Sequence, residues 1–304
     1  MRNTFIDELV KLAAVNERIA LVVGDLGFSV VEPFAERFPD RFINAGVAEQ
    51  NMMGLAAGMA SEGYHVFVYS IANFPTFRCA EQIRNDVDYH RLPVTVVAVG
   101  GGLAYGNLGY SHHAVQDYGL MRLMPNMLIA APGDPMEVRA CLRYLSDHPQ
   151  PSYFRLGKTG EPCFHADVPQ VAPGKWLTVH AGSTSGKSLL TTGAPLAAAS
   201  QWVQQSSLYH GYAVHSLPLW GLASKPAQAL QVQSWTEVVT VEDHLQDAGF
   251  GSWMLESLSA KPDLLTRIRI KALSADVCGM VGRQEVLNEL GGLCVPAVAE
   301  KPAT

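Results

Sequence analysis

The sequence has few charged residues and no long apolar run, and each absence excludes a class of protein. Charged residues make up 16% of the 304 residues, and no Lys/Arg cluster interleaves with aromatic residues, so nucleic acid is not expected as a partner. No apolar run reaches the roughly 18 residues that cross a bilayer, so a membrane protein is not expected. The first residues contain Asp7 and Glu8 and lack the apolar segment of a signal peptide.

Cysteine is also scarce, and its distribution argues against a disulfide framework. The five cysteines are an odd number and form no Cys-x-x-Cys motif. We therefore expect reduced thiols and a cytoplasmic location. Because the net charge is −6, an anionic substrate would need cations placed locally in its site.

What the sequence does contain is a regular alternation of strand-like and helical patterns. Short apolar, β-branched runs at 19–24, 65–70 and 93–99 predict buried strands, and the patterns at 3–16 and 47–61 predict helices. We therefore predict an α/β fold with two doubly wound domains, each a mostly parallel sheet flanked by helices. Further strands are predicted at 127–131, 152–156, 187–192, 212–216, 236–241 and 266–271, and further helices at 75–90, 114–123, 134–147, 195–207, 224–233, 247–259 and 283–291.

The composition changes at a stretch rich in proline and glycine, which we interpret as a boundary. The length suits two domains of about 150 residues. We predict a first domain at 1–160, a linker at 161–182 and a second domain at 183–304.

Three motifs that suggest chemistry fail on closer inspection. The segment 182–188 (Gly-Ser-Thr-Ser-Gly-Lys-Ser) has three residues between its glycines where a phosphate loop needs four, and it precedes a strand. The pair His112-His113 has no third ligand at a suitable spacing. The run 242–244 (Glu-Asp-His) lies in a predicted strand, where adjacent side chains point to opposite faces. We therefore predict no metal site built by this chain alone.

The strongest cluster is the segment 41–58, where a single acid begins an otherwise apolar helix. Its sequence is Arg-Phe-Ile-Asn-Ala-Gly-Val-Ala-Glu49-Gln-Asn-Met-Met-Gly-Leu-Ala-Ala-Gly. Glu49 could simply complement the helix dipole at the first turn, and the residues alone favour that interpretation. Alternatively, it is a partly desolvated carboxylate that shares a proton with a bound base.

The segment 41–58 resembles the signature of the transketolase and deoxyxylulose-phosphate synthase family around its cofactor glutamate, and the resemblance runs over about residues 1–292. It implies that Glu49 bonds to the pyrimidine ring of thiamine diphosphate and activates the cofactor. The segment 74–78 (Phe-Pro-Thr-Phe-Arg) is similar to the aromatic segment that stacks on this ring. The resemblance assigns this role to Phe74, with Phe77 second, and core packing is the alternative for both.

The segment 106–117 resembles the family's Gly-Pro-Thr-His motif. It contains Gly-Asn-Leu-Gly-Tyr-Ser-His112-His113. The match implies that His112 contacts the substrate by hydrogen bonding and proton transfer, and a structural histidine is the alternative. The family usually has aspartate four residues before this histidine. Because this chain has Leu108 there, the usual sugar-donor preference does not carry over.

Three further positions resemble a substrate pocket that binds phosphate, and Asp25 is predicted to bind substrate beside them. Arg2 and Ser29 match an arginine and a serine of the family's pocket, and Asp25 lies in the same loop as Ser29. Lys158 stands where the family generally has arginine, and lysine holds a phosphate less rigidly because it is a point charge. Each residue alone could be a solvated surface residue, but together they predict an anion site.

The sequence lacks the family's diphosphate-binding motif, because neither Gly24-Asp25-Leu26 nor Gly133-Asp134-Pro135 is Gly-Asp-Gly. The resemblance therefore implies the C-terminal, or β, subunit of a split transketolase. An N-terminal subunit would carry the diphosphate domain and hold most of the Mg²⁺ coordination in an α₂β₂ assembly. The resemblance also implies that the second domain mainly supports dimerisation and lies away from the chemistry.

The expected reaction is transfer of a two-carbon ketol unit from a ketose, expected to be phosphorylated, to an aldose. Alternatives within the superfamily are a deoxyxylulose-phosphate synthase-like protein and the β-type E1 subunit of a 2-oxo-acid dehydrogenase. An alternative of another class is a non-catalytic assembly or regulatory subunit. The combination of Glu49 and His112 argues against that class, since a scaffold needs neither.

Overall fold

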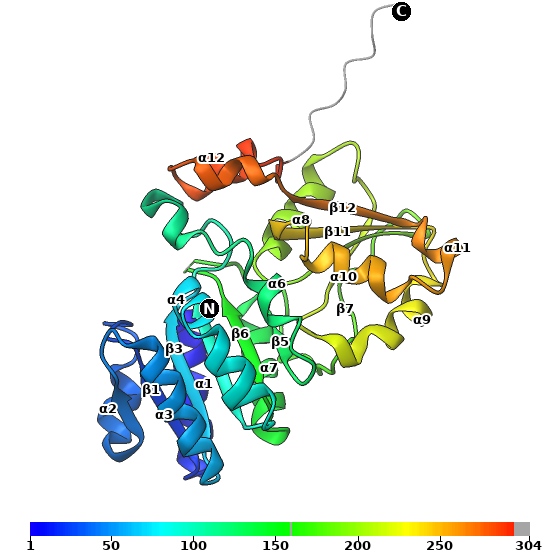
Figure 1. Ribbon diagram of the computed structural model, residues 1–304. Coiled ribbons are helices and arrows are strands. Elements are labelled where there is room, and N and C mark those ends of the chain that lie inside the picture. The colour runs from blue at the N-terminus through cyan, green and yellow to red at the C-terminus, as the bar shows by residue number, and fades with distance from the viewer. Residues whose placement is uncertain (159, 295–304) are drawn as a thin grey trace, which may run out of the picture.

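The computed structural model describes residues 1–158 and 160–294, which form two sheets flanked by helices (Figure 1). The first sheet has seven strands in the order β10-β5-β6-β4-β3-β1-β2, and the second has five in the order β12-β11-β8-β9-β7. Within the described residues, only the pairs β10–β5 and β7–β9 are antiparallel. The predicted α/β fold with two mostly parallel sheets is confirmed.

The first sheet is buried on both faces by helices. Alternate residues of β3 face opposite sides: Val66 and Val68 pack with α3, whereas Phe67 and Tyr69 pack with α1 and α7. Because helices cover both faces of this parallel sheet, its strands are apolar at nearly every position in the sequence. The strands are β1 (Ile19–Val23), β2 (Phe42–Asn44), β3 (His65–Ile71), β4 (Val94–Val99), β5 (Leu128–Ala130), β6 (Ser152–Leu156) and β10 (Leu219–Trp220). The helices are α1 (Arg2–Val15), α2 (Glu32–Arg37), α3 (Glu49–Ser61), α4 (Asn73–Phe77), α5 (Ala80–Gln82), α6 (Asp117–Met121) and α7 (Pro135–Asp147).

The second sheet and its helices form the C-terminal half of the chain. Its strands are β7 (Leu177–His180), β8 (Lys187–Thr191), β9 (Ala213–Ser216), β11 (Glu237–Leu245) and β12 (Ile268–Leu273). Its helices are α8 (Pro195–Gln205), α9 (Gln228–Val232), α10 (Phe250–Ser257), α11 (Pro262–Leu265) and α12 (Gln284–Leu290). None of the helices in the described part of the chain has both the length and the apolar character needed to cross a bilayer.

Two segments differ from the sequence prediction. The predicted helix at 75–90 is three pieces, because the backbone leaves helical geometry at Cys79 (φ −112°, ψ 14°) and continues after α5 as a π-helical turn at Ile83–Asp88. β7 lies inside the range predicted as linker and pairs with β9 at the edge of the second sheet. The predicted domain boundaries themselves stay a prediction.

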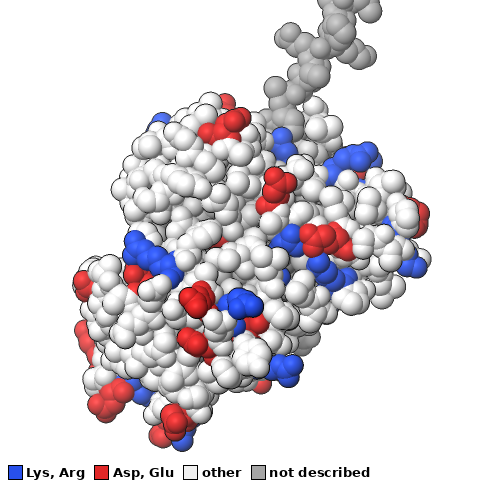
Figure 2. Space-filling model, viewed as in Figure 1, with Lys and Arg blue, Asp and Glu red and all other residues white. Residues whose placement is uncertain are grey.

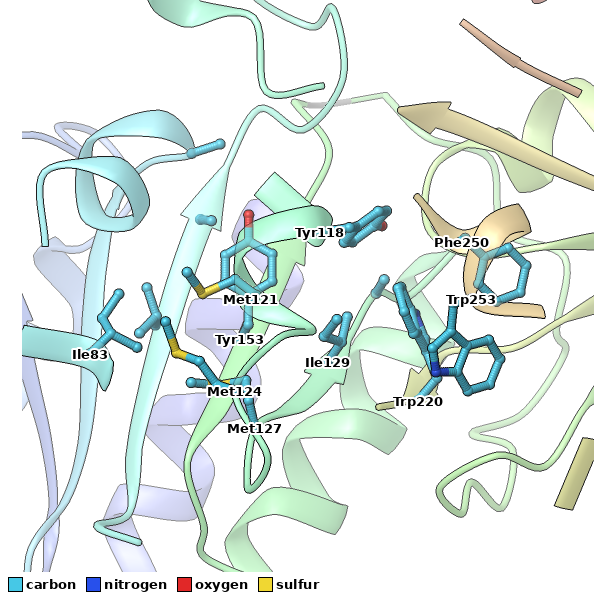
Figure 3. Packing of buried hydrophobic residues seen from close by; sticks show 14 of the residues in the cluster. Ile83, Tyr118, Met121, Met124, Met127, Ile129, Tyr153, Trp220, Phe250 and Trp253 are labelled. Carbon is cyan, nitrogen blue, oxygen red and sulfur yellow. The ribbon is translucent and has the colours of Figure 1, made fainter. Parts of the chain in front are cut away.

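The two halves share a sheet and an aromatic core. β10 comes from the C-terminal half of the sequence but pairs with β5 in the first sheet. Trp220 of β10 packs against Tyr118 at 5.2 Å, Phe250 at 5.3 Å and Trp253 at 5.1 Å between ring centroids (Figure 3). These rings therefore join α6 of the first half to α10 of the second.

A buried ion network crosses the same boundary. Arg155 of β6 donates to Asp117 at 2.7 Å and to Asp243 of β11 at 2.6 Å, and all three side chains are almost completely buried. The neighbouring Glu242 instead accepts hydrogen bonds from the backbone N–H groups that begin α10. His244 bonds to the backbone of Leu245. His244 Nε2 also lies 4.0 Å from Asp117, so Asp243 and His244 both belong to the buried network around Arg155, whereas Glu242 caps α10.

Candidate active site

Glu49 is the first residue of α3, and its carboxylate is buried. The chain turns at Gly46 (φ +71°) after β2 and enters the helix at Glu49. The side chain is 5% exposed, and Oε1 accepts a hydrogen bond of 2.7 Å from Nη1 of Arg78. The helix N-terminus and the guanidinium both stabilise the negative charge. Both interpretations from the sequence are thus compatible with its position: it complements the dipole, and it is desolvated.

Arg78 links Glu49 to Phe74. The guanidinium carbon of Arg78 lies 4.0 Å from the centroid of the Phe74 ring. Phe74 is half-buried in α4, whereas Phe77 at the end of this helix is 47% exposed. Of the two predicted aromatic residues, Phe74 therefore has the ring that is held by more of its surroundings.

Two hollows at the surface meet at Arg78. One of about 480 Å³ is lined by Ala48, Glu49, Gln50, Asn51 and Arg78. The other, of about 360 Å³, is lined by Asn73, Phe74, Phe77, Arg78, Tyr110, Ser111 and Gln116. The carboxylate and the aromatic segment thus face adjacent spaces with one cation between them.

His112 lies beside Phe74 at the end of a short 3₁₀ turn, Tyr110–His112. The imidazole meets the Phe74 ring edge-on at 5.2 Å, and its Nδ1 is 2.9 Å from Oγ of Ser111. Burial lowers the pKa of His112, and the charges of Arg78 and His113 act in the same direction. The imidazole is therefore neutral near pH 7 and can both accept and donate a proton.

Arg2 and Lys158 lie together although 156 residues separate them in the sequence. Nε of Arg2 donates to the backbone oxygen of Lys158 at 2.7 Å. Nζ of Lys158 lies 5.4 Å from the centroid of the Tyr105 ring, which in turn is 6.4 Å from the His112 ring. Within residues 1–158 and 160–294, neither cation has a carboxylate within 4.0 Å.

The buried hydroxyl of Tyr69 is close to the Arg2 guanidinium. Burial raises the pKa of Tyr69 to about 12, and the Arg2 guanidinium acts in the opposite direction. The hydroxyl has no hydrogen-bond partner among the residues described. Arg2 beside this hydroxyl, with Lys158 next to Arg2 and no carboxylate within 4.0 Å of either cation among the described residues, forms a favourable place for an oxyanion.

Asp25 and Ser29 lie in the loop after β1, and both have left-handed backbones (φ 55° and 65°). Asp25 exchanges two hydrogen bonds with Asn44, and the backbone N–H of Ser29 donates to Glu32. No hydrogen bond in the described part of the chain joins either residue to Arg2 or Lys158. The loop packs on Tyr69, the neighbour of Arg2: a Cβ at Gly27 would lie 3.0 Å from the Tyr69 ring and 2.9 Å from Val31.

Leu108 ends a separate 3₁₀ turn in the loop before His112, and 52% of its surface is exposed.

Arg78, Tyr69 and Tyr105 are additional neighbours of the site that the sequence interpretation did not assign. A signal for Arg78 was available, because a lone acid at a buried position requires a cation. Charges of both signs are scattered over the face drawn in Figure 2, without an extended basic surface.

Comparison with known proteins gives one family and several relatives of similar length. The family described as "Transketolase, pyrimidine binding domain" matches residues 1–160. The chain is 32% identical over 276 residues to one of the subunits of apulose-4-phosphate transketolase from Phocaeicola vulgatus, and the match covers 86% of this chain and 84% of that protein. It is 29% identical over 299 residues to a 6-deoxy-6-sulfo-D-fructose transketolase subunit of a Clostridium species, with 96% and 90% covered. A solved structure described as "Split gene transketolase, inactive beta4 tetramer" has a TM-score of 0.82 and 29% identity, and covers 97% of this chain and 93% of that one.

Proposed function

Since the chain belongs to the transketolase family, we propose that it is the C-terminal (β) subunit of a split, thiamine diphosphate-dependent transketolase. The reaction proposed is transfer of a two-carbon ketol unit from a ketose to an aldose. The single observation that carries the proposal is the arrangement of Glu49, Arg78 and Phe74 beside adjoining hollows. The proposed cytoplasmic location is supported by the five cysteines, which are free thiols.

The residues present fit the pyrimidine ring of this cofactor. A nitrogen heterocycle needs a carboxylate to exchange a proton with and an apolar ring face to lie against, and Glu49 and Phe74 offer these on either side of Arg78. When bound, thiamine diphosphate supplies the electron sink that allows a bond beside a carbonyl group to break. Glu49 would hold and return a proton at its carboxylate, and Phe74 would orient the ring.

His112 would act on the substrate as a neutral imidazole. Its lowered pKa leaves one ring nitrogen free to accept a proton at neutral pH. The contact with Ser111 and the edge-on packing against Phe74 hold the ring next to the hollow that Phe74 lines. Such a group exchanges protons with hydroxyl groups of a sugar.

The substrate class proposed is a sugar with a terminal oxyanion, with Arg2, Asp25, Ser29, His112 and Lys158 in its site. Support comes from the two cations that no carboxylate neutralises within the described residues, and from the unpaired Tyr69 hydroxyl. Two relatives are named for a sugar phosphate and for a sulfo sugar, and both groups are oxyanions. A plain 2-oxo acid needs no such second anion site, so a dehydrogenase-type subunit is less favoured.

The partner proposed is an N-terminal subunit that carries the diphosphate-binding domain and most of the Mg²⁺ coordination, in an α₂β₂ assembly. The exposed face of α3 fits contact with another chain, because it is uncharged from Gln50 to Gly58 and has no Cβ at Gly54 or Gly58. A relative composed of one type of chain is described as an inactive β₄ tetramer. That description supports the expectation that this chain needs a partner for activity.

The test is ketol transfer by the chain reconstituted with its N-terminal partner, thiamine diphosphate and Mg²⁺. Glu49→Gln should lower kcat by roughly 10²–10⁴-fold, because the amide cannot exchange the proton. Glu62→Gln, at the exposed other end of the same helix, is the matched control and should be fully active. Unchanged turnover in Glu49→Gln would refute the catalytic role and favour the assembly-subunit alternative. Full turnover by the single chain would refute the split site.

A further inference from the structure

The loop that carries His112 is held at its base by the C-terminal half of the protein. This loop (residues 100–112, here the His112 loop) follows β4. At its base, a side chain at Gly101 would overlap the Arg155 guanidinium, and one at Gly102 would overlap the Asp243 carboxylate. The first residues of the loop are therefore packed directly against the ion network that joins the two halves.

The tip of the same loop is covered by α12 and the residues just before it. Figure 1 shows α12 lying beside the segment that follows β4. The N–H of Gly282 donates to the carbonyl oxygen of Gly106 at 3.2 Å, and Leu287 of α12 is 1% exposed. A Cβ added at Gly106 would lie 2.5 Å from Cδ1 of Leu287 and 2.8 Å from the Gly282 oxygen. The Gly106 backbone is therefore packed directly against Leu287 and Gly282.

The covered tip leads directly to the histidine. The N–H of His112 donates to the carbonyl oxygen of Gly109 at 2.9 Å, and Gly109 itself bonds back to Gly106 at 3.2 Å. Val281 lies against Gly109, since a Cβ there would meet its Cγ2 at 3.3 Å. A shift of the Gly106 backbone is therefore transmitted through two short turns to the imidazole beside Phe74.

We propose that Leu287, together with the Gly282 backbone, is a positioning residue for His112. The family resemblance implied that this half lies away from the chemistry, whereas here its last helix sets the backbone from which His112 projects. The inference rests on the proposed function, because His112 is assigned there to the substrate. Leu287 itself lines neither hollow of the site, so it acts only through the loop.

The experiment compares Leu287→Ala with Leu264→Ala in the complex reconstituted with the N-terminal subunit. Leu264 is a buried leucine of α11 in the same half, packed in a different apolar cluster. Both truncations should lower the melting temperature. Only Leu287→Ala should lower kcat/KM, by roughly 10–100-fold, because a displacement near 1 Å has an effect of this size. Leu287→Met, which conserves volume, should restore most of the activity.

A second measurement separates positioning from general loss of stability. The His112 imidazole is titrated by NMR in the full chain, with its signal assigned by its absence in His112→Asn. In Leu287→Ala the loop should loosen and the pKa of His112 should rise towards its ordinary value, because burial is the main cause that lowers it. In Leu264→Ala it should stay unchanged.

The inference is overturned if Leu287→Ala and Leu264→Ala lose activity equally, or if the His112 titration is the same in both. That failure can be told apart from failure of the proposed function. If Glu49→Gln abolishes turnover while the two leucine variants behave alike, only the positioning role is wrong. If Glu49→Gln retains turnover, the proposed function is wrong.

Discussion

Removal of the Arg78 guanidinium should destabilise the protein through the carboxylate that it leaves behind. In Arg78→Ala, the 5%-exposed Glu49 loses its 2.7 Å partner. Breaking a fully buried ion pair costs roughly 3–5 kcal/mol. Because the Arg78 side chain is 47% exposed and solvent screens it, we expect a smaller loss of about 1–2 kcal/mol in the free energy of unfolding. At roughly 2–4 °C per kcal/mol for a chain of this size, the melting temperature should fall by several degrees.

The design that isolates this effect is a double-mutant cycle in the purified full chain. Glu49→Gln keeps the shape of the side chain and removes the charge, so it should tolerate Arg78→Ala better than the wild type does. The two losses should therefore be less than additive, by about 1 kcal/mol in urea or thermal unfolding. Arg84→Ala is the control, since the Arg84 side chain bonds only to its neighbour Asn85 among the residues described. Strictly additive losses would show that the ion pair contributes nothing, and the geometric argument for Arg78 as the partner of Glu49 would be refuted.

Two further predictions concern the anion site and the pH dependence of stability. Arg2→Ala and Lys158→Met should each raise KM for a phosphorylated ketose by roughly tenfold with little change in kcat. Lys11→Ala is the control and should leave KM unchanged. If the two substitutions raised KM for an uncharged ketose as much as for the phosphorylated one, an oxyanion site would be contradicted. Burial raises the pKa of Glu137 to about 7 from its ordinary 4.5, so the folded state binds the extra proton and stability should fall as pH rises from about 4.5 to about 7. In Glu137→Gln, the decrease in the free energy of unfolding between pH 5 and pH 8, measured by urea titration, should be smaller by about 1–3 kcal/mol. An unchanged dependence of stability on pH would contradict the raised pKa of Glu137.

The parts of the fold that the sequence predicted are those with a local signal. β3 and β4 are mostly apolar because both faces of the sheet are covered, and α7 begins at Pro135 after Asp134, which caps it with a hydrogen bond. β10 has two residues and is a strand only because β5 lies beside it. This pairing joins segments far apart in the sequence, so the pattern of residues 219–220 alone does not predict a strand.

The same distinction applies to the candidate site. Glu49, Phe74 and His112 were identified by resemblance to a family, and the structure brings them into one chain of contacts through Arg78. The neighbourhood of Arg2 and Lys158 also came from that resemblance, since 156 residues separate them. A buried Glu49 signals the need for a cation, but the sequence could not show that Arg78 supplies it, because 29 residues separate the two and only packing brings them together. The roles of all these residues stay predictions until tested.

The two residues of β10 have a mechanical consequence. A hinge between the two halves would have to pull β10 off β5, withdraw Trp220 from between Tyr118 and Trp253, and separate Arg155 from Asp243. Each of these steps exposes buried apolar surface or leaves a buried charge unpaired. We therefore expect the two halves to move together as one rigid unit. Opening of the site is then expected from exposed side chains such as Arg78, or from movement of the proposed partner subunit.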